Sequence, residues 1–264
     1  MKQKTNEEIL SSLKKANKER KLYMATKAGF SSVEEYKDFL SKPEGTNRCF
    51  EPNKKETIHI VNLLDVSSSM NSSNKIGKAL EGLNAEVQKL SQDSNVEYIY
   101  SLTTFSYATS IVKKVDRMPI NKVKNISASA SGYTALNDAI GEVLTSLKNS
   151  SEKSKERVVV SIFTDGEEND SRKFSNLDIS RLIEECQSLG IIVTFIGTEK
   201  DTKDVIKNFK IDASNTLVHN NTSKGVSDSF GTKLASVMMY SSKVTRGVKQ
   251  EELLTGFYKT TGKL

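Results

Sequence analysis

The chain of 264 residues has no tryptophan, only two cysteines and three prolines, and no apolar run that approaches the length of a membrane span. The cysteines, Cys49 and Cys186, give neither a disulfide framework nor the spacing of a zinc site. The first 20 residues are polar and lack the apolar centre of a signal peptide. From these absences we expect a cytoplasmic protein with reduced thiols and no contact with a membrane.

Several enzyme motifs are also missing. No glycine-rich loop has the pattern of a P-loop or a dinucleotide-binding site, and no Ser, His and Asp residues are arranged as a catalytic triad. The two histidines are isolated, and His59 alternates within an apolar segment as a core or edge histidine does, while His219 has no companion. Neither histidine is therefore predicted to be a metal ligand.

The excess of positive charge is small. The chain has 39 basic and 33 acidic residues, a net charge of +6, and residues 1–56 carry 13 basic against 9 acidic ones. This basic segment could contact nucleic acid or an acidic partner, but an excess of this size is more typical of a solvated helix face. Nucleic acid is therefore not expected as a partner.

The chain after residue 56 alternates β-branched apolar segments with segments of helical periodicity, which is typical of an α/β fold with a mostly parallel sheet. Strands are predicted at 57–64, 96–105, 109–115, 157–164, 191–196 and 216–218. The short connection between the second and third predicts an antiparallel hairpin. Helical spacing of apolar residues occurs over 76–90, 136–147, 182–189, 203–209 and 226–237.

Four parts are predicted along the chain. They are a helical appendage at 1–45, a polar linker at 46–56, the α/β domain at 57–245 and a tail at 246–264. The helices of the appendage bury too little apolar area to be stable alone, so we expect them to dock on the domain or on a partner.

Asp65, Ser67 and Ser69 follow the first predicted strand directly, in the pattern Asp-x-Ser-x-Ser. Residues at i, i+2 and i+4 of an extended backbone project to the same side, so three oxygen-bearing side chains meet near one point. Such oxygens suit Mg²⁺, Ca²⁺ or Mn²⁺ rather than zinc or copper. Taken alone, the three residues are more typical of a serine-rich turn in which the aspartate caps a turn or a helix.

Two further segments favour the metal interpretation. A glycine-containing turn places Thr134 at the start of a helix, and a second β-branched strand ends in Asp165 and Gly166. In this order, the segments DVSSSM, SGYTALNDAI and FTDGEEN resemble the von Willebrand factor type A family over roughly residues 57–245. The resemblance implies a doubly wound, mostly parallel six-stranded sheet of order 3-2-1-4-5-6, with one antiparallel edge strand and flanking helices.

The resemblance also implies a complete metal-ion-dependent adhesion site. Its metal positions correspond to Asp65, Ser67, Ser69, Thr134 and Asp165. In the family the hydroxyls coordinate the ion directly and the two aspartates act largely through water, which leaves a position open for the Asp or Glu of a partner protein. Mg²⁺ is the expected ion, with Mn²⁺ or Ca²⁺ as alternatives. In doubly wound sheets ligands bind where the strand order reverses, which here lies between the strands that end at Asp65 and Asp165.

We therefore expect a metal-dependent protein–protein interaction module and not an enzyme. One alternative is a structural subunit of a larger bacterial or phage assembly that docks through its N-terminal helices. Another is a metal-dependent phosphoester hydrolase, which is disfavoured because no Lys, Arg or His lies in the three motifs. Asp138 is predicted on a helix surface rather than behind the metal site. The run Glu167–Asp170 is predicted to be a solvated loop rather than a source of negative potential at the ion.

Overall fold

The computed structural model describes residues 55–151 and 156–258, together with residues 16, 21, 33, 34, 36 and 37 nearer the N-terminus. The chain divides into two units, Met1–Lys55 and Glu56–Leu264. The appendage predicted at 1–45 and the linker at 46–56 fall almost entirely outside the described residues, so their predicted structure stays a prediction.

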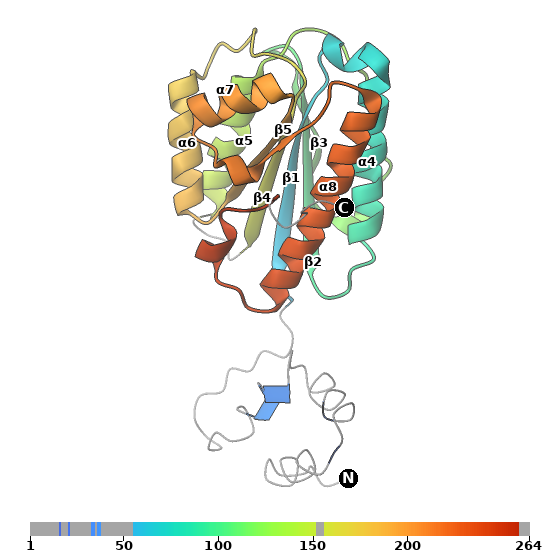
Figure 1. The fold of residues 1–264 in the computed structure, drawn as a ribbon, viewed down its shortest axis with the longest axis vertical. Coiled ribbons are helices and arrows are strands. Elements are labelled where there is room, and N and C mark those ends of the chain that lie inside the picture. The colour runs from blue at the N-terminus through green and yellow to red at the C-terminus, as the bar shows by residue number, and fades with distance from the viewer. Residues whose placement is uncertain are drawn as a thin grey trace. The chain divides into compact units, whose positions relative to one another are not determined.

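The second unit contains one six-stranded sheet (Figure 1). Its strands are β1 (Thr57–Asp65), β2 (Glu97–Phe105), β3 (Ile111–Pro119), β4 (Arg157–Phe163), β5 (Ile192–Gly197) and β6 (Thr216–Val218). They lie in the order β3-β2-β1-β4-β5-β6, and every neighbouring pair is parallel except β2 and β3. The predicted fold, strand order and antiparallel edge are confirmed.

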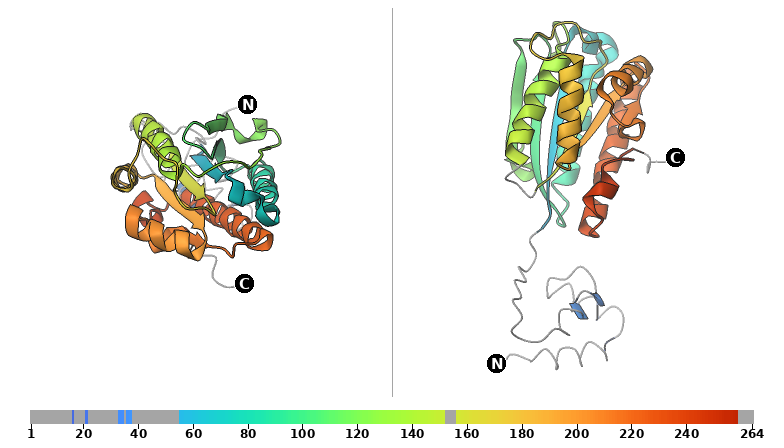
Figure 2. Two further views of the ribbon diagram at one scale, coloured as in Figure 1. Left: turned by 90° about the horizontal axis from the view of Figure 1, so that it is seen from above. Right: turned by 90° about the vertical axis from the view of Figure 1, so that its left-hand side faces the viewer.

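Five α-helices cover this sheet within the described part of the chain. They are α4 (Lys75–Leu90), α5 (Leu136–Ser151), α6 (Asn176–Ser188), α7 (Glu199–Phe209) and α8 (Ser223–Thr245). Figure 2 shows helices on both faces of the sheet. None of the helices described is both long and apolar enough to cross a membrane.

The sheet has a hydrophobic core on each of its two faces. Side chains of the central strand β1 contribute to the two cores in alternation, because successive side chains of a strand point to opposite faces. Ile58 and Ile60 pack with buried residues of α4 and α8. Val61 and Leu63 pack with buried residues of α5, α6 and α7. β1 is buried along almost its whole length, as expected for a central strand of a parallel sheet covered on both faces.

A buried ion pair joins α4 and α8 within the first of these cores. Lys233 of α8 contacts Glu86 of α4, and both side chains are almost completely buried. The other oxygen of Glu86 accepts hydrogen bonds from the Asn62 amide at 3.1 Å and from the Tyr100 hydroxyl at 3.2 Å. Through Glu86, this polar cluster therefore links strands β1 and β2 to helices α4 and α8 inside the core.

Helices α6, α7 and α8 extend beyond the segments predicted for them. The helix predicted at 203–209 begins at Glu199, because Thr198 and Asp201 form a capping box that satisfies amide groups at its start. After α8 the chain folds back onto the domain, and Phe257 and Tyr258 are buried. The Tyr258 hydroxyl donates a hydrogen bond to Thr194 Oγ1 of β5 at 3.1 Å.

Candidate metal centre

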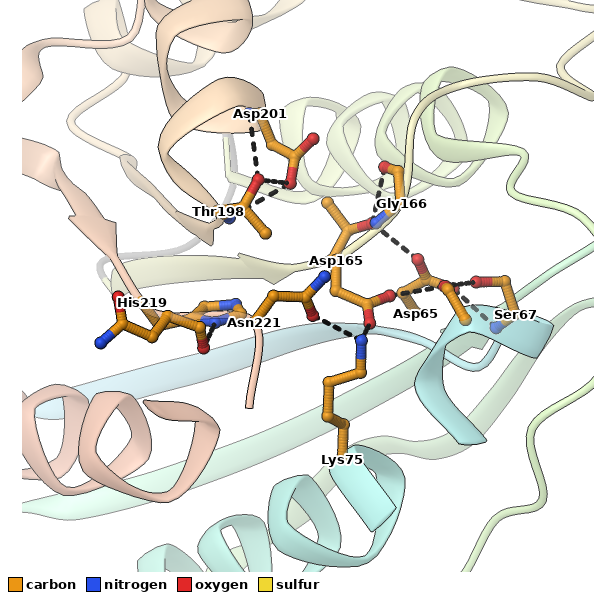
Figure 3. A network of polar contacts seen from close by, with 12 residues as sticks. Asp65, Ser67, Lys75, Asp165, Gly166, Thr198, Asp201, His219 and Asn221 are labelled. Atoms are coloured by element: carbon orange, nitrogen blue, oxygen red, sulfur yellow. Dashed lines mark hydrogen bonds and ion pairs between the residues drawn. The ribbon is translucent and has the colours of Figure 1, made fainter. Parts of the chain in front are cut away.

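The predicted metal ligands gather at the carboxyl edge of the sheet, beside the central pair β1 and β4. Asp65 is the last residue of β1, and Asp165 lies two residues beyond the end of β4. The strand order reverses between these two strands, which is where doubly wound sheets bind ligands. Figure 3 shows Asp65, Ser67 and Asp165 close together in this region.

Asp65 is fully buried and held by two hydrogen-bond donors. The Thr164 hydroxyl donates to Asp65 Oδ2 at 2.6 Å, and the Ser67 amide donates to Asp65 Oδ1 at 2.7 Å. Burial raises the pKa of the Asp65 carboxyl to about 6, although the hydrogen bonds from Thr164 and Ser67 favour the ionised form. The carboxylate is thus fixed in place but poorly solvated, so a nearby cation would stabilise it.

The two serines link the first motif to the second aspartate. Ser67 Oγ and Ser69 Oγ are 2.9 Å apart, and Ser69 Oγ donates to Asp165 Oδ1 at 2.6 Å. Met70, which follows them, is completely buried and anchors the turn in the core. Residues 96 positions apart in the chain are therefore joined through one hydroxyl.

Thr134 is fixed by Asn169, which belongs to the run that was predicted to be a solvated loop. The Thr134 amide donates to Asn169 Oδ1 at 2.8 Å, and the Asn169 amide donates to the Thr134 carbonyl at 3.0 Å. A methyl group placed on Gly166 would lie 3.0 Å from Thr134 Oγ1, 3.4 Å from Ser69 Oγ and 3.5 Å from Asp65 Oδ2. Oxygens from the first two motifs therefore border the small space beside Gly166, which belongs to the third motif.

The donor set fits a hard divalent cation. Among the residues that the structure describes, there is no group of three or more His, Cys, Asp or Glu side chains that could hold a metal. The candidate site instead combines two carboxylates with three hydroxyls. Oxygen-only sets of this kind suit Mg²⁺, Mn²⁺ or Ca²⁺ and do not suit zinc or copper.

Lys75 is the member of this cluster that the sequence analysis missed. Its ammonium group contacts Asp165 Oδ2, and the two side chains are 3% and 0% exposed. The same ammonium donates a hydrogen bond to the Asn221 side chain (Figure 3). Lys75 lies outside the three motifs, as the first residue of α4. A lysine at a helix N-terminus with no acidic residue in the first turn is electrostatically unfavourable. This unfavourable placement is the feature of the sequence that could have indicated a role for Lys75.

The prediction that Asp138 lies on a helix surface is wrong. Asp138 is completely buried. Its Oδ1 accepts hydrogen bonds from the amides of Lys173 and Phe174 at 2.8 and 3.0 Å, and its Oδ2 accepts one from the Arg172 amide at 2.9 Å. Asp138 thereby fixes the loop that follows Asp165.

Within the run Glu167–Asp170, predicted to be a solvated loop, Glu167 and Asn169 are exposed, whereas Glu168 and Asp170 are partly buried. Glu167 is exposed and pairs with Lys200. Glu168 accepts hydrogen bonds from the amides of Asn137, Asp170 and Ser171. The Asp170 carboxylate accepts one from the Ala108 amide at 2.8 Å. The run is therefore a structural part of the site, because its carboxylates supply acceptors for loop amides.

The two histidines and Cys186 are packed or hydrogen-bonded within the fold. His59 is buried and shares a hydrogen bond of 2.9 Å with Ser101 Oγ. His219 stacks on Phe163 with ring centroids 5.3 Å apart. Cys186 is completely buried, and burial raises the pKa of its thiol to about 11. None of the three is among the contacts described for the candidate ligands.

Two exposed tyrosines lie beside the candidate ligands. The rings of Tyr107 and Tyr133 meet edge to face, with centroids 5.5 Å apart, and Tyr133 is 60% exposed. Tyr133 directly precedes Thr134. Gly132 has φ +91°, and a side chain there would collide with the ring of Tyr107. The loop therefore needs glycine at this position to bring the two rings together.

Comparison with known proteins agrees with this architecture. Residues 59–232 match the family model described as von Willebrand factor type A domain. No curated protein matches the chain. Among solved structures, the pilus adhesin SpaC from Lactobacillus rhamnosus GG, in its open conformation, is similar with a TM-score of 0.56 and 11% identity. The match covers 70% of this chain and 30% of the adhesin chain, and at this identity it shows the fold alone.

Proposed function

This chain belongs to the von Willebrand factor type A domain family, and we propose that it is an interaction module that binds a partner protein through a divalent cation. The proposed ligands are Asp65, Ser67, Ser69, Thr134 and Asp165. The observation that carries the proposal is the small space beside Gly166, because oxygens of Asp65, Ser69 and Thr134 border it from two other segments of the chain. Mg²⁺ is the proposed ion, with Mn²⁺ or Ca²⁺ as alternatives.

Bound there, a divalent cation would supply positive charge that attracts a carboxylate of the partner. The residues of this chain prepare the position beforehand. Thr164 and the Ser67 amide orient the Asp65 carboxylate, Ser69 orients one oxygen of Asp165, and Asn169 fixes the backbone of Thr134. Preorganisation of this kind lowers the entropic cost of binding. The partner's contribution in this proposal is an Asp or Glu side chain.

The tyrosine pair supports a protein partner. Exposed aromatic residues are enriched at the energetically important centres of protein interfaces. Tyr107 and Tyr133 offer such a surface next to Thr134. We propose that the partner packs against these rings while its carboxylate approaches the cation.

The described site does not favour phosphoester hydrolysis. Besides the cation, hydrolysis would require a charged or acid–base side chain that faces the transferring phosphoryl group. Lys75 is the ammonium group nearest the candidate ligands among the contacts described, but its side chain is 3% exposed and engaged by Asp165 and Asn221. The arrangement of the described residues therefore supports a binding role.

Calorimetric titration of Mg²⁺ and Mn²⁺ into the purified protein tests the proposal. We expect saturable binding, and we expect the double variant Ser67→Ala/Ser69→Ala to lose it because two hydroxyl ligands are removed. Ser72→Ala is the matched control, since Ser72 is an exposed serine of the same turn. Equal binding by the wild type and the double variant would contradict the proposed ligand set.

A second titration tests the role of the partner's carboxylate. Mn²⁺ binding is measured in acetate and in chloride at equal ionic strength, because acetate is a minimal substitute for an Asp or Glu side chain. We expect tighter Mn²⁺ binding in acetate, after correction for the weak binding of acetate to free Mn²⁺. Identical affinities in the two salts would remove the carboxylate from the proposal and leave the metal site.

A further inference from the structure

We propose that Lys75 is a built-in competitor of the divalent cation, so that it sets the metal affinity of the site. In this view its ammonium neutralises Asp165 when no divalent ion is bound, and an ion that enters the site must overcome the repulsion of the ammonium or move it away from Asp165. The inference rests on the proposed function, because it concerns the same site. It adds a residue that lies outside the three motifs.

The backbone before α4 directs Lys75 into the site. Ser73 and Asn74 both adopt the left-handed conformation, with φ of +53° and +56°. Two successive non-glycine residues in this region are uncommon and cost conformational free energy. The side chain of Asn74 also lies against Gly77, where any larger residue would collide with it. The turn is therefore built in a way that places Lys75 at the first position of the helix.

The position is unfavourable for a lysine in two respects. The N-terminus of a helix carries partial positive charge, which repels a cation. Lys75 is also buried, and a buried ammonium group needs a partner to offset its lost hydration. The Asp165 carboxylate and the Asn221 side-chain oxygen provide that compensation. The placement therefore depends on Asp165, one of the proposed metal ligands.

The contacts of Asp165 show why the ammonium and the ion compete. Ser69 Oγ occupies one carboxylate oxygen, and the Lys75 ammonium occupies the other. The two candidate carboxylates, Asp65 and Asp165, carry a charge of −2 when both are ionised, and Lys75 cancels one unit of it. A divalent ion that enters must therefore either overcome the repulsion of the ammonium or move it away.

The same charge has a consequence for the partner. A cation that shares its site with an ammonium group is less fully neutralised by the chain itself. The surplus positive charge is then available to a carboxylate from outside. Lys75 thus weakens the hold of the chain on the ion while strengthening the attraction of the loaded site for an acidic residue of the partner.

Mn²⁺ titration of the Lys75→Met variant tests the inference. Methionine keeps most of the length of the side chain and removes its charge. We expect the variant to bind Mn²⁺ at least tenfold more tightly than the wild type, a change of about 1.4 kcal/mol. Lys78→Met is the matched control, because Lys78 lies one turn further along α4 and pairs at the surface with Glu81. We expect its Mn²⁺ affinity to stay within about twofold of the wild type.

Thermal unfolding gives a second readout that does not depend on binding a partner. Lys75→Met leaves Asp165 without its ammonium partner, so we expect a lower Tm in EDTA and a larger rise on addition of Mn²⁺ than in the wild type. A variant that folds only with Mn²⁺ would also support the inference, because the ion would have replaced the ammonium. Lys75→Gln, which keeps a hydrogen-bond donor near Asp165, serves if the methionine variant does not fold at all.

The outcomes separate this inference from the proposed function. Equal or weaker Mn²⁺ binding by Lys75→Met would overturn the inference and leave the metal-dependent interaction module intact. If neither the wild type nor any variant bound Mn²⁺ saturably, the inference and the proposed function would both be overturned. Tighter binding by both Lys75→Met and Lys78→Met would point to net charge instead of the contact with Asp165, and would also overturn the inference.

Discussion

Asp138 offers the strongest test of how the loop after Asp165 is held. Its carboxylate accepts three backbone hydrogen bonds, and the side chain is completely buried. In Asp138→Asn one oxygen can still accept from Lys173 and Phe174, but the amide nitrogen would face the N–H group of Arg172. One buried donor would then be left unsatisfied, which costs about 1–3 kcal/mol.

Asp138→Ala should cost more, because all three N–H groups lose their acceptor. Hydrogen bonds to a charged group contribute about 1.5–3 kcal/mol each, and water entering the site would recover part of that loss. We therefore expect a decrease of about 3–5 kcal/mol in the free energy of unfolding. Urea denaturation at neutral pH measures both variants.

The same two variants should also weaken Mn²⁺ binding, since the loop that Asp138 holds carries Gly166 and Asn169. Glu142→Gln is the control, because Glu142 lies on the same helix and makes an exposed ion pair with Lys173. We expect that control to change stability by less than about 0.5 kcal/mol. The reasoning would be refuted if Asp138→Ala were no more destabilising than Glu142→Gln.

Three further predictions concern the core and the metal site. Lys233→Met should lower the free energy of unfolding by about 3–5 kcal/mol in urea denaturation, because it leaves the Glu86 carboxylate buried without its cation; a loss below about 1 kcal/mol would contradict this. Burial, assisted by Arg117, lowers the pKa of His59 to about 4. The wild type should therefore lose up to about 3 kcal/mol more stability than His59→Asn as the pH falls from about 6.5 to 4, and equal pH profiles would refute this. Gly166→Ala should fold with nearly unchanged Tm but bind Mn²⁺ more weakly, because the methyl group would fill the space that the candidate ligands border; wild-type affinity would contradict that placement.

Most of the fold was predictable because its signals are local. β-branched runs marked the strands, and the short connection after Phe105 marked the antiparallel pair. The strand order came from the resemblance carried by three motifs, since no local pattern states which strands lie side by side. The early start of α7 was also visible in the sequence, because Thr198 and Asp201 have the spacing of a capping box.

The roles of Lys75 and Asp138 were harder to predict, for one shared reason. Each depends on groups far away in the chain: Lys75 contacts Asp165, and Asp138 accepts from the amides of residues 172–174. A charged residue next to a loop is usually solvated, and local pattern favours that interpretation. Lys75 and Asp138 are buried because a carboxylate or unpaired backbone amides from distant loops lie beside them. Those partners become known only when the positions of the loops are known.

The Glu86–Lys233 contact also limits how the domain can change shape. Moving α8 by one helical turn, about 5.4 Å, would carry the ammonium away from its carboxylate and leave two buried charges apart. The segment after α8 is also anchored to the sheet, because the Tyr258 hydroxyl donates a hydrogen bond to Thr194 Oγ1 of β5. These contacts favour one position of α8 on the sheet. We therefore expect that conformational change on binding a partner would be confined to the loops around Thr134 and Gly166.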